Sequence, residues 1–243
     1  MKGFRIKAFV WGGLAGFLFL AGCGGEEDVR AGVNFRMLLE PSVEGVDDAL
    51  DIGGSAMALG VSEVTVHLQG IRFLLAGERE QWFGFSGPFT LGVHEDAQGA
   101  SGLRLPLPPG EYAAVELTLG PGKEADGDAE GFSVEGTGLY QGRSQSAPLR
   151  FAFASTSVTR IDMPRPMRVA WEAERVEVRL SQRDWFGDLN MMLELCLAYP
   201  PVPFDDEGVL QITGGSNQGC DAVVGLLRQN FGAALERASV VVR

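Results

Sequence analysis

The residues best suited to chemistry include three cysteines in a chain of 243 residues. Cys196 and Cys220 form an even pair, and in an oxidising compartment such a pair is most simply a disulfide. The alternative is two buried free thiols that act as small apolar side chains. The third cysteine, Cys23, directly follows an uncharged and mostly apolar run at residues 8–22.

Two histidines and two acidic segments are the candidate metal ligands. His67 alternates with apolar neighbours and should be exposed on a strand, whereas His94 precedes acids in a polar loop. Residues 126–131 (DGDAEG) resemble a calcium loop, because acids occupy positions 1, 3 and 5 and glycine position 6. The twelfth position is Thr137, which lacks the bidentate carboxylate of an EF-hand. We therefore expect a solvated hairpin loop there, and a turn at residues 205–208.

Three tryptophans could bind a flat ligand. Trp82, Trp171 and Trp185 each offer a ring that can stack on a sugar or another planar group. The alternative is that these rings fill the core of the protein or its edges. Exposure of the ring decides between the two interpretations.

No pattern of a known catalytic site is present. The chain lacks G-x-S-x-G, H-E-x-x-H, C-x-x-C and the P-loop signature. Carboxylates could act as a pair in hydrolysis, but they are so numerous that none can be singled out. We expect a protein that is not an enzyme and has no cofactor, with an envelope hydrolase as the alternative.

The first 22 residues have the layout of a secretory signal peptide. Lys2, Arg5 and Lys7 precede the apolar run, and small residues end it. A transmembrane helix needs about 20 apolar residues, and this run is shorter and is interrupted by Gly12, Gly13 and Gly16. The flank that follows, residues 26–28, is acidic. Export therefore explains the segment better than a membrane span.

Leu20-Ala21-Gly22-Cys23 resembles the lipobox of bacterial lipoproteins at all four positions. The resemblance implies that Cys23 is alkylated by a diacylglyceryl group, becomes the mature N-terminus and is then acylated. Several acyl chains anchor a protein stably. In enterobacterial members of that family, aspartate after the cysteine favours the inner membrane. Gly24 stands there instead, so the resemblance implies the outer membrane of a Gram-negative bacterium.

The charge of the chain excludes some partners. The formal net charge is −12, and removal of residues 1–22 takes away three basic residues and no acid, which leaves −15. Such a balance argues against nucleic acid and against electrostatic adhesion to anionic lipid. It is typical of a solvated acidic surface, which leaves calcium or a cationic partner as alternatives.

Alternation with a period of two predicts many short strands after residue 31. The runs begin at Val33, Val64, Ile71, Ala113, Leu149 and Val176. The phase flips at Gly70, which predicts a β-bulge there. Turn signals stand at residues 108–110, 120–122 and 164–166. The pattern predicts a mainly β fold, an antiparallel β-sandwich in one domain at residues 31–243.

Three further segments differ from this pattern. Residues 23–30 should form a lipidated tether, and residues 45–60, rich in small side chains, a long loop. Apolar residues recur at helical spacing between Cys220 and Leu235, which predicts one C-terminal amphipathic helix at about 219–236. Residues 239–243 could add a last short strand.

Residues 107–112 (LPPGEY), followed by Val115-Glu116-Leu117, resemble a turn-and-strand motif of uncharacterised β-sandwich lipoproteins of bacteria. The motif is also similar to one in periplasmic proteins linked to copper, which makes a periplasmic metal-binding protein a further alternative. Neither resemblance supplies a catalytic residue. The sequence predicts a lipid-anchored envelope protein with a binding or structural role, whose partner is another envelope protein or a glycan.

Overall fold

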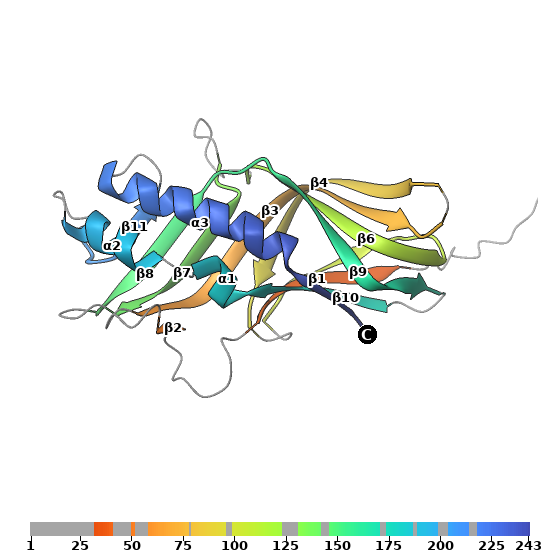
Figure 1. Ribbon diagram of the computed structural model, residues 1–243, viewed down its shortest axis with the longest axis horizontal. Helices are drawn as coiled ribbons and strands as arrows, with labels where there is room; N and C mark the ends of the chain where they lie inside the picture. Colours follow the sequence, from red (N-terminus) through yellow and green to blue (C-terminus); the bar gives the residue numbers. More distant parts are fainter. Residues whose placement is uncertain are drawn as a thin grey trace, which may run out of the picture.

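The computed structural model describes most of the chain after residue 31. The described residues are 32–40, 50–51, 58–77, 79–95, 99–122, 131–141, 146–170, 174–186, 189–198, 204–213 and 218–243. They form a mainly β fold with two sheets and few helices (Figure 1). The predicted fold class is therefore confirmed at this level.

The smaller sheet has four strands in the order β12-β10-β1-β5. These strands are β1 (Val33–Glu40), β5 (Gly102–Leu105), β10 (Glu174–Ser181) and β12 (Ser239–Val242). The predicted last strand is thus present as β12. Strand β1 pairs in parallel with β10 and antiparallel with β5.

The larger sheet is built around one long strand, β3 (Ala58–Leu75). One edge of β3 pairs first with β7 (Val134–Gln141) and then with β6 (Gly110–Leu119), and β4 (Gln81–Val93) pairs on the other edge. The register shifts between Leu68 and Gly70, which confirms the predicted bulge. The order is completed by β8 (Ser146–Phe153), β9 (Val158–Val169), β11 (Leu210–Thr213) and β2 (Leu50–Asp51).

Four details of the expected architecture are wrong. The strands are not all antiparallel, because β1 pairs with β10 and β11 with β8 in parallel. Residues 164–166 are not a turn but lie inside β9. The expected loop at 45–60 contains β2 and the start of β3. Two helices, α1 (Gln182–Phe186) and α2 (Leu189–Ala198), precede the expected one.

The C-terminal helix is confirmed as α3 (Gln218–Glu236). Its buried residues, Cys220, Val223, Val224, Leu227, Phe231, Ala234 and Leu235, recur every three or four positions and form one apolar face. Cys220 forms a disulfide with Cys196 of α2, which confirms the predicted pair and joins the two helices covalently.

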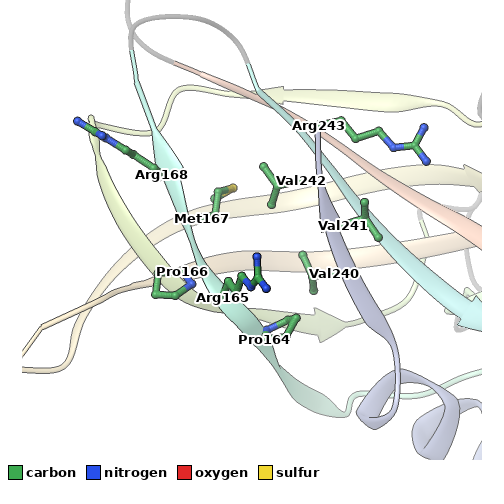
Figure 2. Close-up of a pocket in the computed structure, with 9 residues that line it drawn as sticks. All are labelled: Pro164, Arg165, Pro166, Met167, Arg168, Val240, Val241, Val242 and Arg243. Atoms are coloured by element: carbon green, nitrogen blue, oxygen red, sulfur yellow. The ribbon is translucent and has the colours of Figure 1, made fainter.

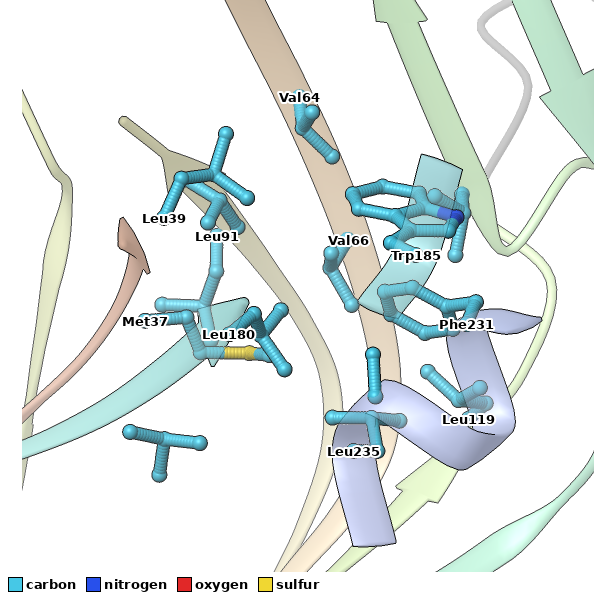
Figure 3. Packing of buried hydrophobic residues seen from close by; sticks show 14 of the residues in the cluster. Met37, Leu39, Val64, Val66, Leu91, Leu119, Leu180, Trp185, Phe231 and Leu235 are labelled. Atoms are coloured by element: carbon cyan, nitrogen blue, oxygen red, sulfur yellow. The ribbon is translucent and has the colours of Figure 1, made fainter. Parts of the chain in front are cut away.

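One hydrophobic cluster includes residues of both sheets and of the helices. Met37 and Leu180 of the smaller sheet, Val66 of β3 and Phe231 of α3 all belong to it (Figure 3). Trp185 of α1 packs against Phe231, with ring centroids 4.7 Å apart. The apolar positions that alternate along the strands therefore face this common core.

Candidate functional site

A groove of about 540 Å³ lies between β9, an edge strand of the larger sheet, and β12, an edge strand of the smaller sheet. Its lining consists of residues 164–168 and 240–243 (Figure 2). This volume is within the usual range for ligand sites. The groove therefore brings together edge strands of the two sheets, which are far apart in the sequence.

The groove combines an apolar floor with basic rims. Met167 and Val240 are buried, and Val242 is exposed at 37%. Figure 2 shows Met167 and Val242 facing one another, with Arg165 beside Val240. Arg168 and Arg243 extend outward on the two sides, and the lining contains no acidic residue.

Prolines shape the β9 side of the groove. Tyr112 of β6 pairs with Met167 of β9, but Ala114, two residues further along β6, pairs with Asp162, five residues earlier in β9. The extra residues of β9 therefore bulge out of the sheet. Pro164 and Pro166 lie in this bulge and have no backbone N–H to donate. Such prolines are tolerated on an edge strand and protect it from pairing with another strand.

Arg243 also belongs to a buried ion-pair network. The Glu177 side chain is fully buried, and its Oε2 accepts a hydrogen bond of 2.9 Å from Arg179 and lies 3.8 Å from Nε of Arg243. Its Oε1 has no hydrogen-bond partner in the described part of the chain. By contrast, Arg165 and Arg168 form no ion pair with any described residue. No acid of the described residues therefore neutralises their charges.

Two of the three tryptophans predicted to stack on ligands lie within the described residues, and these two do not form a common binding face. Trp185 is completely buried against Phe186 and Phe231, so its assignment as a stacking residue is wrong in this structure. Trp82 is partly exposed, but the guanidinium groups of Arg72 and Arg160 lie 5.1 and 5.8 Å from its ring centroid. Trp171 lies outside the described residues.

His67 contacts polar side chains of two neighbouring strands on the outer surface of the larger sheet. Its Nδ1 is 3.1 Å from Thr90 Oγ1 and its Nε2 is 3.3 Å from Glu135 Oε1. The His67 side chain is only 12% exposed, so it is less accessible than expected. The described residues contain no group of three or more His, Cys, Asp or Glu that could hold a metal ion.

The acidic segments have separate outcomes. The predicted turn at 205–208 is present, and the Asp205 carboxylate accepts hydrogen bonds from the backbone N–H groups of Val209 and Glu207 and from the Gln211 amide. These hydrogen bonds lower the pKa of Asp205, and the bond from the Val209 backbone has the largest effect. The Asp205 carboxyl group therefore stays ionised. Asp205 is therefore a structural carboxylate. The calcium-like segment falls at 126–131, of which only Gly131 is described.

Cys23 and the predicted signal peptide at residues 1–22 lie outside the described residues. Within the described part of the chain, no helix has the length and apolar character needed to cross a bilayer.

Sequence reasoning missed the groove. The signal that could have found it is a group of arginines at positions 160, 165 and 168, within an otherwise acidic chain. No sequence signature indicates that this segment and the C-terminal strand line the same groove. No protein-family model matches the chain, and no curated protein or solved structure matches it either.

Proposed function

We propose that this chain is a lipid-anchored protein of the bacterial cell envelope with a binding role, and that it is not an enzyme. The anchor is the diacylglyceryl group on Cys23, and the location is the outer membrane of a Gram-negative cell. The match of Leu20-Ala21-Gly22-Cys23 to the lipobox, placed after a basic and then apolar start, supports this proposal.

We also propose that the two sheets pack face to face as a β-sandwich. Phe35 of the smaller sheet meets Phe73 of the larger sheet edge to face, with ring centroids 6.4 Å apart. The inward-facing residues of both sheets belong to one hydrophobic cluster. Such contacts between inner faces are typical of sandwiches.

The binding site in this proposal is the groove between β9 and β12, and its ligand is an acidic, partly apolar segment of a partner protein. The observation that carries it is the lining: three arginines surround apolar side chains, without any acid among them. Arginine and apolar contact surface are enriched at protein interfaces. A glycan is less well supported, because Trp185 is buried and Arg72 and Arg160 lie against Trp82.

The anchor is tested by metabolic labelling of cells with palmitate. The wild-type chain should incorporate label and lose its first 22 residues, and Cys23→Ser should do neither. Label on the Cys23→Ser chain, or an intact precursor for the wild type, would show that Cys23 is not the anchor.

The groove is tested in cells with a photoreactive amino acid at Val241, which lines the groove, and in a second strain at exposed Val158. We expect a discrete ultraviolet-dependent adduct from position 241 only. Arg165→Glu should abolish this adduct, because it reverses a groove charge. Arg228→Glu makes the same charge change on an exposed position of α3 and should leave the adduct intact. Equal adducts from both strains would refute a specific groove.

A further inference from the structure

We propose that the end of the domain at which β1 begins docks on anionic headgroups of the bilayer that holds the anchor. The surface consists of Arg104, Arg175 and Arg243, which we call the arginine row. Arg243 also lines the groove between β9 and β12, so the arginine row and the groove share this one residue. This inference rests on the proposed lipid anchor and adds an orientation of the domain on the membrane.

The strand register places the arginine row across four adjacent strands. Asn34 of β1 pairs with Arg104 of β5 on one side and with Arg175 of β10 on the other. Arg175 exchanges two backbone hydrogen bonds, of 2.8 and 3.0 Å, with Arg243 at the end of β12. Neighbouring strands are about 4.8 Å apart, so the three guanidinium groups start from backbone positions in one short line.

These side chains lie on the outer face of the smaller sheet. Val33 and Phe35, which flank Asn34, are fully buried in the core, and so is Val176, which follows Arg175. Successive residues of a strand point to opposite faces, so Asn34 and Arg175 point outward. Arg104 and Arg243 are exposed and Arg175 is half-buried. The row is therefore accessible to a flat surface.

The anchor keeps this end of the domain close to the bilayer. Val33 is ten positions after Cys23, and even a fully extended chain of that length spans only roughly 33–36 Å. Val33 is the neighbour of Asn34, so the tether joins the domain at the arginine row itself. Of the parts that the structure describes, this is the one nearest in sequence to the proposed anchor.

One group of acids lies far from the arginine row. Asp205, Asp206, Glu207 and Asp221 lie beside β11 and at the start of α3, the end opposite the start of β1 in Figure 1. Salt screens charges beyond about 8–10 Å, so these distant acids do not cancel the arginine row. Among the residues whose side chains the structure describes, Glu111 and the buried Glu177 lie near the row, and its three arginines outnumber them. The net charge of the whole chain, which argued against adhesion to anionic lipid, therefore misrepresents this surface.

The test uses the mature lipidated protein in phosphatidylcholine vesicles that contain either no phosphatidylglycerol or about one third phosphatidylglycerol. Hydrogen exchange is measured for peptides that cover residues 101–105 and 239–243. We expect exchange there to slow about fivefold or more with phosphatidylglycerol, because each arginine near an anionic surface contributes about a fivefold change in affinity. Added salt at about 1 M should abolish the slowing.

Two triple variants provide the controls. Changing Arg104, Arg175 and Arg243 together to Gln should abolish the slowing, whereas changing the same three to Lys should preserve it. Arg104 is exposed and has no ion pair to a described residue, so Arg104→Gln alone should weaken the slowing of exchange without disturbing the fold. This single variant keeps the test valid if the Gln triple variant misfolds. Equal exchange on both vesicles, or full slowing in the folded Gln variants, overturns the docking proposal.

Flotation separates this proposal from the anchor beneath it. Protein that floats with neutral vesicles but shows no lipid-dependent slowing keeps the anchor and refutes the docking. Protein that fails to float with neutral vesicles refutes the anchor, and the inference that rests on it falls as well.

Discussion

Glu177 is a buried carboxylate on a sheet face that also carries several arginines. Arg179 and Arg243 lie against its Oε2, and its side chain is fully buried. An isolated buried charge is costly, whereas a paired one is tolerated. Glu177 therefore holds positively charged side chains together that would otherwise repel one another.

Removal of this charge should destabilise the fold. We expect Glu177→Gln to lower the free energy of unfolding by about 3 kcal/mol, because it leaves the arginines without their buried partner. Urea titration measures the change. Glu135→Gln is the matched control: its carboxylate is half exposed beside His67, so the loss should stay below about 1 kcal/mol. Similar losses for the two variants would contradict the network.

At the scale of the elements, two glycines have opposite roles. A Cβ atom at Gly138 of β7 would overlap the carbonyl oxygen of Gly60 on the neighbouring strand β3. A Cβ atom at Gly225 of α3 meets nothing within 4 Å. Close approach of two strands therefore requires glycine at 138, whereas the helix does not require it at 225.

The same substitution should thus have opposite signs at these two sites. Gly138→Ala should destabilise by about 1–3 kcal/mol through overpacking. Gly225→Ala should stabilise by about 0.5–1 kcal/mol, because alanine loses less backbone entropy in a helix. Thermal unfolding of both variants measures this, and a lower Tm for Gly225→Ala would show that α3 is not packed as described.

The disulfide between α2 and α3 stabilises the helical layer. Its two cysteines are 24 residues apart in the sequence, so a chain-entropy argument gives about 3–4 kcal/mol. We expect the double variant Cys196→Ser/Cys220→Ser to lose about that much in urea titration. Reductant should lower the stability of the wild type to the same level and leave the variant unchanged. A wild type insensitive to reductant would contradict this role.

Local patterns predicted the elements better than their pairing. Alternation located the strands around Phe35, Val66, Leu117 and Phe151, and helical spacing located α3, because each reflects burial of one face. Strand β4 also alternates, from Phe83 to Val93, but its Gly87-Pro88 step resembles a turn. The residues at 164–166 failed similarly, since proline on an edge strand and proline in a turn have the same local signature. The parallel partner of β1 depends on residues far along the chain.

At the scale of the whole molecule, the contact between the sheets is measurable. If Phe35 and Phe73 join the two proposed layers, a double-mutant cycle with leucine at each position should give a coupling of about 0.5–1.5 kcal/mol. Phe35 and Phe231 have no ring contact with one another, and their cycle should give a value near zero. A coupling near zero for Phe35 and Phe73 would remove this support for face-to-face packing.

The parallel pairing of β1 with β10 has a consequence for how the chain folds. Phe35 is opposite Val176 in that register, so the first strand to be synthesised waits for one that emerges much later. Contacts so distant in sequence make folding slow, and an unpaired edge invites aggregation in the interval. A nascent chain would thus remain incompletely folded until most of it had been made, a state that is compatible with the export proposed above.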